Sequence, residues 1–385
     1  MTLKYFAIPF KATCEVCGDS RVNISRHLKV CCDCAKEGSA KAMKLIYEAH
    51  AKSRAKFGLP AAPPKDPNGL ECRRCGNECQ ISEDEKGYCG LAENRDGNFV
   101  RLATPKIGIV RAYYDPHPTN CTAAWTCAGG SEHGYPTYSV SKGAEHGYYN
   151  LAVFYGSCTY DCLFCQNPQW RKMTQELKPI MSAEELASKV NERTTCICYF
   201  GGDPSSQIAH AIETAKIARE RKKELNKQGR CEDILRICLE TNGNMKESWL
   251  DEIAEISLAS GGGIKFDLKA WNENLHVALS GASNKQSLEN IRRIGKYHKE
   301  RPEVPFIRAS TLLVPGYVDT EEVKNIASYL AEIDPTIPYS LLAFMPQFEM
   351  SDLPPTSRKL AYKCKEMAEK AGLERVIIGN KWSLV

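Results

Sequence analysis

The feature that most constrains this chain is a trio of cysteines directly after an apolar, strand-like run. Cys158, Cys162 and Cys165 lie in the segment LAVFYGSCTYDCLFCQ, residues 151–166. Three thiolates spaced C-x₃-C-x₂-C can hold three irons of a [4Fe–4S] cluster, whose sites normally take four cysteines. The fourth iron then has no thiolate from this motif and is free to bind another molecule. Structural zinc is the alternative, but it takes four ligands, and no fourth Cys or His lies close by in the sequence.

Composition narrows the class of protein. The chain has 385 residues, and its 51 basic and 47 acidic side chains leave a net charge of +4, which gives no nucleic-acid signature. No run approaches the 18 or more apolar residues of a membrane span, and the first 17 residues lack the pattern of a signal peptide. Nineteen cysteines in such a chain favour metal binding over disulfides, because a reducing cytosol keeps thiols free. We expect a cytoplasmic, oxygen-sensitive metalloprotein that binds neither nucleic acid nor membranes.

The amino-terminal region holds two C-x-x-C knuckles separated by 13 residues. This spacing suits a tetrahedral zinc site, because each knuckle supplies two thiolates from one tight turn. The expected ligands are Cys14, Cys17, Cys31 and Cys34. A helical pattern follows, so residues 1–58 are expected to form a zinc-ribbon-like module plus a helix. The Pro-rich segment 59–69 then reads as a linker.

Four more cysteines lie within 18 residues, in a segment with glycines at its turns. They are Cys72, Cys75, Cys79 and Cys89. Their spacing predicts a second closed metal site within residues 70–102. Zinc, a single iron and an iron–sulfur cluster all remain open, since four thiolates bind each of them. A structural role is preferred to electron relay.

Residues 103–149 are rich in Tyr, Gly, Pro and His, and we expect an irregular insertion without its own helix or strand. A loop of this length is usually functional or disordered, and its aromatic content argues against disorder. It leads directly into the first strand of the following domain, so we expect it to cover the open mouth of that domain. Cys121 and Cys127 are candidate ligands or redox partners, although a lone C-x₅-C pair is a weak signal.

From residue 150 onward the sequence alternates apolar strand-like runs with helical patterns. Strands are expected at 150–155, 195–200, 234–239, 263–268, 306–313, 338–345 and 375–379. Helices are expected at 182–193, 205–226, 246–259, 285–299, 320–333 and 357–371. Such alternation predicts an α/β domain with a parallel sheet over 150–385. Ser182 and Glu185 form a capping-box pattern for the first helix, and Asp319 or Thr320 can cap the fifth.

The cysteine trio and the motifs at the strand ends resemble those of the radical S-adenosylmethionine (SAM) superfamily. The motifs are GGDP at 201–204, ETNG at 240–243, FDLK at 266–269 and LVPGYVD at 313–319. Over 70–385 the chain is similar to the activating-enzyme-like and AmmeMemoRadiSam branch, related to pyruvate formate-lyase activating enzyme. The resemblance implies a partial (βα)₆ barrel, with SAM bound to the open iron of the cluster. It also implies a one-electron reductant such as flavodoxin or ferredoxin, and cleavage of SAM to a 5′-deoxyadenosyl radical.

The resemblance also assigns individual roles. Residues expected to contact SAM are Gly201, Gly202, Asp203, Pro204, Glu240, Asn242 and Arg308, with Arg308 pairing with the SAM carboxylate. Asp203 stands where the family usually has Glu. Asp267 and Lys269 are the expected catalytic pair, and their period-two spacing sends both side chains to one face of a strand. Met345 stands where the branch has His, which puts glycine activation in doubt because a thioether donates no hydrogen bond.

Three function classes follow. The first is an enzyme that abstracts a hydrogen atom from a protein or peptide residue. The alternative is a radical SAM C-methyltransferase or other protein-modifying enzyme, for which cobalamin is a candidate cofactor, although no D-x-H-x-x-G cobalamin motif occurs. The third, a non-catalytic metal-binding scaffold, would leave the SAM-contacting motifs without a purpose.

Overall fold

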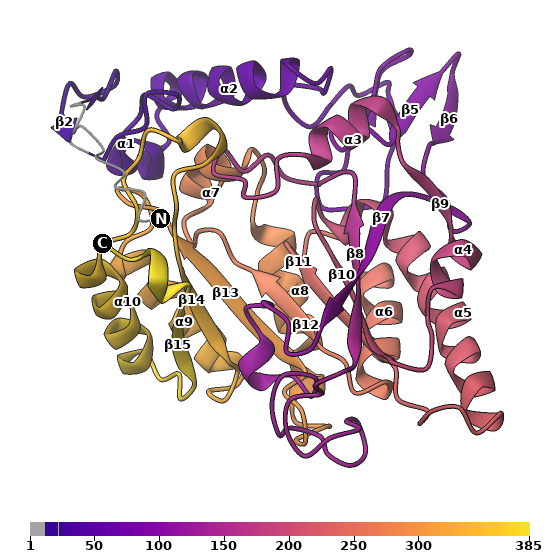
Figure 1. Cartoon of the computed structure of the whole chain (residues 1–385). Coiled ribbons are helices and arrows are strands. Elements are labelled where there is room, and N and C mark those ends of the chain that lie inside the picture. Colours follow the sequence, from indigo (N-terminus) through magenta and orange to yellow (C-terminus); the bar gives the residue numbers. More distant parts are fainter. Residues whose placement is uncertain (1–11, 22) are drawn as a thin grey trace, which may run out of the picture.

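A computed structural model describes residues 12–21 and 23–385, and a nine-stranded sheet forms its centre (Figure 1). The strand order is β15-β14-β13-β12-β11-β10-β8-β7-β9. Neighbouring strands from β8 to β15 are parallel, whereas β7 pairs antiparallel with both β8 and β9. The sheet strands are β7 (Ile107–Pro116), β8 (Tyr149–Tyr155), β9 (Ile180–Ser182), β10 (Thr194–Phe200), β11 (Arg236–Thr241), β12 (Ile264–Asp267), β13 (Ile307–Leu313), β14 (Tyr339–Ala343) and β15 (Val376–Gly379).

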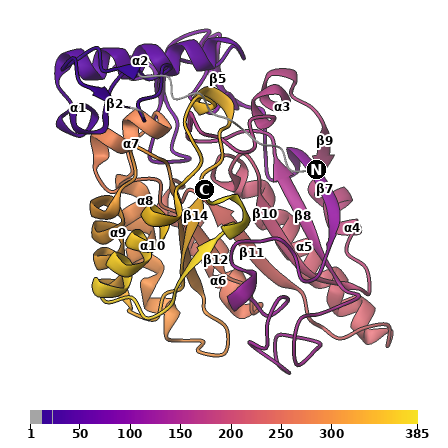
Figure 2. The same cartoon turned by 60° about the vertical axis from the view of Figure 1, so that its left-hand side comes forward.

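Helices follow the parallel strands and cover one face of the curved sheet (Figure 2). The helices of this region are α3 (Trp170–Glu176), α4 (Ala183–Ser188), α5 (Ile208–Lys227), α6 (Glu247–Ala259), α7 (Glu273–Ser280), α8 (Lys285–Gly295), α9 (Thr320–Ile333) and α10 (Arg358–Lys370). Short 3₁₀ helices are η1 (Ala124–Thr126), η2 (Pro204–Gln207), η3 (Lys296–His298), η4 (Phe348–Met350) and η5 (Lys381–Ser383). All seven predicted strands and all six predicted helices are present within a few residues, although α4 ends earlier than expected.

Local sequence signals explain these elements. Parallel strands are buried on both faces and therefore read as continuous apolar runs, as in β13, where every residue is buried. The capping box at α4 is confirmed, because the Ser182 hydroxyl accepts from the Glu185 N–H and the Glu185 carboxylate accepts from the Ser182 N–H. The Asp319 carboxylate caps α9. The short helices α3 and α7 were not expected, since each is too short to show a clear helical period.

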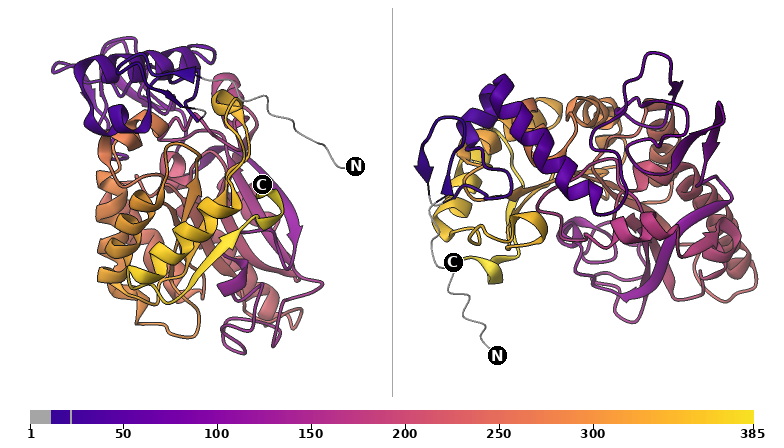
Figure 3. Two further views of the ribbon diagram at one scale, coloured as in Figure 1. Left: turned by 90° about the vertical axis from the view of Figure 1, so that its left-hand side faces the viewer. Right: turned by 90° about the horizontal axis from the view of Figure 1, so that it is seen from above.

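The two cysteine-rich segments lie at the carboxyl ends of the parallel strands. The first contains β1 (Ala12–Thr13), β2 (Ser20–Arg21), α1 (Cys32–Glu37) and α2 (Ala40–Ala55), and the second contains β3 (Leu70–Glu71), β4 (Gln80–Ile81), β5 (Ala92–Arg95) and β6 (Asn98–Arg101). The predicted single helix is split into α1 and α2 by Gly38, whose φ of 66° is left-handed. Seen from above, α2 crosses over the strand ends (Figure 3).

The expectation of an irregular insertion over 103–149 is wrong in its first part. Residues 107–116 form β7, a ten-residue strand paired with β8. Because this pairing is antiparallel, β7 ends beside the start of β8, where Pro116 faces Tyr149. The remaining loop therefore lies at the amino-terminal end of the strands, opposite α2 (Figure 1). It closes that end and does not cover the mouth of the barrel, where the cysteine-rich segments lie instead.

None of the helices in the described part of the chain combines the length and apolar character needed to cross a membrane. Residues 1–11, which begin the stretch judged to lack a signal peptide, lie outside the described residues.

Candidate active site

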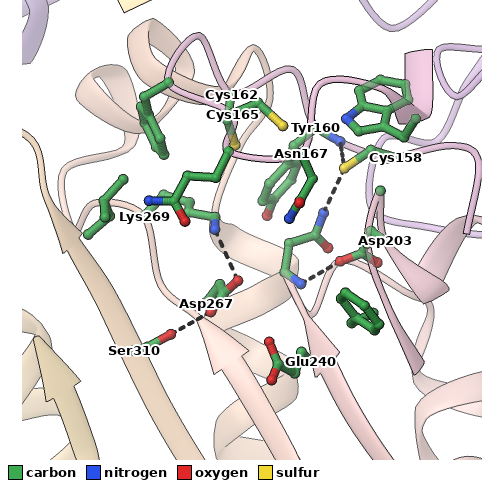
Figure 4. A pocket seen from close by; sticks show the side chains of 18 of the residues that line it. Cys158, Tyr160, Cys162, Cys165, Asn167, Asp203, Glu240, Asp267, Lys269 and Ser310 are labelled. Carbon is green, nitrogen blue, oxygen red and sulfur yellow. Dashed lines mark hydrogen bonds and ion pairs between the residues drawn. The ribbon is translucent and has the colours of Figure 1, made fainter. Parts of the chain in front are cut away.

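A pocket with a volume of about 190 Å³ opens at the carboxyl ends of the parallel strands (Figure 4). Its walls come from the cysteine loop after β8, from the ends of β10 to β14, and from Thr122 of the insertion below. The predicted site residues among its lining are Cys158, Cys162, Cys165, Gly201, Gly202, Asp203, Glu240, Asn242, Asp267 and Lys269. Motifs separated by more than 100 residues in the sequence thus meet at one place, as expected for the carboxyl ends of barrel strands.

The three cysteines of the loop share one wall of this pocket (Figure 4). The Cys158 sulfur lies 3.4 Å from the Tyr160 N–H nitrogen and 3.7 Å from the Asn242 amide nitrogen. Among the described residues, the sulfurs of Cys158, Cys162 and Cys165 do not all lie within 4.8 Å of one another. That spread fits thiolates bound to three different irons better than thiolates around one ion. The chemistry and placement of the thiols therefore fit a [4Fe–4S] cluster with an iron facing the pocket.

A buried charge network holds the cysteine loop in place. Asp161, inside the motif, accepts hydrogen bonds from Arg171 of α3 at 2.6 Å and from His50 of α2 at 3.0 Å. All three side chains are buried. Burial on its own would raise the pKa of Asp161, but His50 and the guanidinium groups hold it well below its usual range. The amino-terminal module is thereby tied directly to the loop that would carry the cluster, a contact that sequence reasoning missed.

The glycines after β10 allow two loops to approach closely. A Cβ atom at Gly202, whose φ is +34°, would lie 2.1 Å from the backbone oxygen of Ser157, so no other residue fits without movement. The next residue, Asp203, uses its carboxylate to accept the backbone N–H groups of Asn242 and Ser205, at 2.6 and 2.7 Å. Burial raises the pKa of Asp203 to about 6, and these hydrogen bonds partly oppose that shift.

Asp267 and Lys269 face the same pocket, as the period-two argument predicts, and their charged atoms are 3.2 Å apart. A second lysine, Lys265, lies 3.1 Å from Asp267 and 2.8 Å from Glu240. Burial alone would raise the pKa of Asp267, but the two ammonium groups keep it well below its usual range. The floor of the pocket therefore carries two cations and two anions in one chain of ion pairs.

Lys265 was missed by the sequence reasoning, although its signal was present. In the run Lys265-Phe266-Asp267-Leu268-Lys269, the same period of two that pairs Asp267 with Lys269 also places Lys265 on that face.

Two of the residues predicted to contact SAM, Arg308 and Pro204, do not line the pocket. Arg308 lies near the start of β13, where its guanidinium donates to the Thr126 hydroxyl at 2.9 Å and to the Thr126 backbone oxygen at 2.8 Å. This placement does not support the prediction that Arg308 pairs with SAM, because the guanidinium is bound to Thr126 and does not line the pocket. Pro204 is the first residue of η2 and is buried beside the pocket. Met345, which stands where the resembling branch has His, is half-buried and does not line the pocket.

The two amino-terminal cysteine sets differ in spacing. The ligand atoms of Cys14, Cys17, Cys31 and Cys34 all lie within 4.8 Å of one another. Zn–S bonds of about 2.3 Å separate tetrahedral ligand sulfurs by about 3.8 Å, so this set fits a single ion.

The second set, Cys72, Cys75, Cys79 and Cys89, is buried, but within the described part of the chain no three of its sulfurs come that close. This segment lies against the active-site loop. The Ser157 hydroxyl donates to the Cys89 backbone oxygen at 2.8 Å, and the Asn77 amide donates to the Thr159 backbone oxygen at 2.7 Å.

Comparison with known proteins agrees with this geometry. The family model of the radical SAM superfamily matches residues 152–330. A protein of Methanocaldococcus jannaschii, provisionally named as a glycyl-radical enzyme activating enzyme, is 29% identical over 225 residues, which are 55% of this chain and 74% of that protein. An uncharacterised protein of the same organism is 24% identical over 321 residues, 82% of each chain. The pyruvate formate-lyase 1-activating enzyme of Escherichia coli K12 is 27% identical over 173 residues, 44% of this chain and 63% of that enzyme.

The matched segment begins in β8 and ends in α9, so it includes the cysteine loop, the glycine turn and the Asp267–Lys269 strand. Residues 152–330 of this enzyme therefore match the radical SAM superfamily, and the chain is similar to proteins named as activating enzymes of glycyl-radical enzymes.

Proposed function

We propose that this enzyme abstracts a hydrogen atom from a residue of a protein or peptide. The observation that carries the proposal is that the cysteine trio, the glycine turn and the Asp267–Lys269 pair line one pocket. Cys158, Cys162 and Cys165 would hold the [4Fe–4S] cluster, which together with SAM and one electron from a reductant would supply a 5′-deoxyadenosyl radical.

The remaining residues of the pocket then position SAM and substrate. Gly201 and Gly202 let the backbone approach the SAM amino group closely. Asp267 and Lys269 present opposite charges in a partly enclosed site, where they orient polar groups more strongly than in water. Asn242 keeps its amide against Cys158 and so fixes that side of the cysteine loop.

The relatives support a macromolecular substrate and an external electron donor. Two of them are named as activating enzymes, and one of these names specifies pyruvate formate-lyase. We therefore expect a protein or peptide substrate, and a one-electron reductant such as flavodoxin or ferredoxin.

The test is an anaerobic assay with reconstituted enzyme, SAM and dithionite. Purified proteins encoded by neighbouring genes, produced in deuterated medium, are added one at a time. The true substrate transfers deuterium into 5′-deoxyadenosine, which mass spectrometry detects, and Cys162→Ala enzyme is the control. Formation of S-adenosylhomocysteine and a methylated product, without deuterium transfer, would contradict the proposal and point to a methyltransferase.

We further propose that both amino-terminal cysteine sets bind metal. The first set has the spacing of a single structural ion such as zinc. The wider second set suits an iron–sulfur cluster, and Arg101 donates to the Cys72 sulfur at 3.3 Å, which would stabilise a negatively charged site. Cys17→Ser should remove one ion per chain and lower thermal stability while the affinity for SAM changes little. Unchanged metal content in Cys17→Ser would contradict the first assignment.

A further inference from the structure

A second cavity, with a volume of about 50 Å³, lies at the closed, amino-terminal end of the strands. Glu240 and Lys265 line both this cavity and the active-site pocket, so the two spaces share a wall. Five of the fourteen residues around the second cavity are cysteines, whereas only 19 of all 385 residues are cysteines. They are Cys121, Cys127, Cys196, Cys198 and Cys238. The thiols come from the insertion, from β10 and from β11, and are free of disulfides.

His117 lines the same cavity, and its imidazole ring has no hydrogen-bond partner in the described part of the chain. Its side chain is 4% exposed, and among the described residues neither ring nitrogen meets a donor or acceptor within hydrogen-bond distance. The nearest carboxylate oxygen, on Glu145, is 3.7 Å from Nε2. Buried polar groups are almost always satisfied, so an unpartnered imidazole facing a cavity requires an explanation. Neutral imidazole is the commonest protein ligand for metals.

Two of the thiols already have the separation of ligands on one ion. The sulfurs of Cys196 and Cys238, on adjacent strands, are 3.7 Å apart. Tetrahedral zinc with Zn–S bonds of about 2.3 Å places two thiolates about 3.8 Å apart. Arg308 and Lys265 line the cavity and can balance the negative charge of bound thiolates.

We propose that this cavity binds one thiophilic metal ion, of which zinc is the probe. Cys196 and Cys238 anchor it, and His117 and Cys127 complete a tetrahedral set of three sulfurs and one nitrogen. Among the described residues no third ligand atom lies within 4.8 Å of both anchoring sulfurs, so binding requires rotation of the Cys127 and His117 side chains. The ion would fasten the insertion to β10 and β11, beneath the floor of the active site.

The experiment measures zinc per chain in the full-length protein, purified anaerobically, exposed to zinc and passed over a desalting column with a weak chelator. Cys238→Ser should hold one equivalent less than the wild type. Cys231→Ser, which alters a half-buried cysteine outside every cysteine set described above, is the matched control and should lose none. His117→Ala should bind zinc at this site at least tenfold more weakly. Equal zinc content in Cys238→Ser and Cys231→Ser would overturn the proposal.

A second measurement does not depend on the folding of Cys238→Ser. X-ray absorption at the zinc edge is recorded on Cys17→Ser, in which the amino-terminal site is disabled. The expected zinc shell contains sulfur together with an imidazole nitrogen, and the nitrogen signal should disappear in the Cys17→Ser/His117→Ala protein. A shell made of sulfur alone in Cys17→Ser would also overturn the proposal. Recovery of a Cys196–Cys238 disulfide from wild-type protein that binds no zinc would show a redox pair in place of a metal site.

Discussion

The charged residues that line the active-site pocket and those at the closed end of the parallel sheet have different partners. At the carboxyl end, three cysteines and the ion pairs around Asp267 face a pocket. At the amino end, Arg236 binds Glu145 through two hydrogen bonds of 2.8 and 2.6 Å, and Arg308 binds Thr126. There the charges join one chain segment to another. A charged residue of this sheet therefore indicates a role at the pocket only once its place along the strand and its partners are known.

The largest expected effect is at the carboxyl end. Replacing Cys158, Cys162 or Cys165 with Ala should abolish 5′-deoxyadenosine formation, because each thiolate is one third of the proposed cluster ligands. The SAM-responsive iron–sulfur signal in electron paramagnetic resonance should disappear as well. Cys364→Ala, which alters a buried cysteine of α10, is the control. SAM cleavage by the triple Cys→Ala variant would show that the cluster lies elsewhere.

At the amino end the corresponding loss should be in stability. Glu145→Gln leaves the buried Arg236 guanidinium without its anionic partner, which should cost about 3–5 kcal/mol in the free energy of unfolding. Urea unfolding measures this loss. Turnover per folded molecule should remain near that of the wild type, since neither residue lines the pocket. A fall in turnover without loss of stability would break the distinction between the two ends.

Lys269→Met should keep the cluster spectrum and lower turnover about ten- to a thousandfold, equivalent to about 1–4 kcal/mol. The reason is that Lys269 is one of the charged groups facing the pocket. Lys269→Arg preserves the charge and should retain more activity. Arg308→Met is the matched change at the closed end, and it should lower stability while leaving the KM for SAM unchanged. Full activity in Lys269→Met would mean that the pair with Asp267 is only structural.

A smaller, pH-dependent effect is expected at Asp203, whose burial raises its pKa to about 6. The folded state therefore favours the protonated Asp203 carboxyl. The stability that Asp203 contributes to the folded protein is complete below about pH 4 and is lost as the pH rises through 6. Between pH 4 and pH 7 the metal-free wild type should lose about 2–3 kcal/mol of stability relative to Asp203→Asn. Denaturant unfolding at both pH values measures the difference. Parallel pH dependence in the two proteins would show that Asp203 titrates normally.

The sequence by itself determined the seven parallel strands, most of the helices and the metal chemistry of the cysteine loop. These features are local: apolar periodicity identifies buried strands, and ligand spacing within one loop is written in consecutive residues. The Asp267–Lys269 pair was also predictable, because a period of two fixes the face of a strand.

Only the tertiary structure decided which end of the sheet each segment occupies. The insertion closes the amino end because β7 pairs antiparallel with β8, a long-range pairing whose partner and direction the β-branched and aromatic residues of β7 do not specify by themselves. The same pairing places Thr126 against Arg308 and thereby removes Arg308 from the active site. The thiol-lined cavity likewise exists only after folding, since its five cysteines come from three separate segments of the chain.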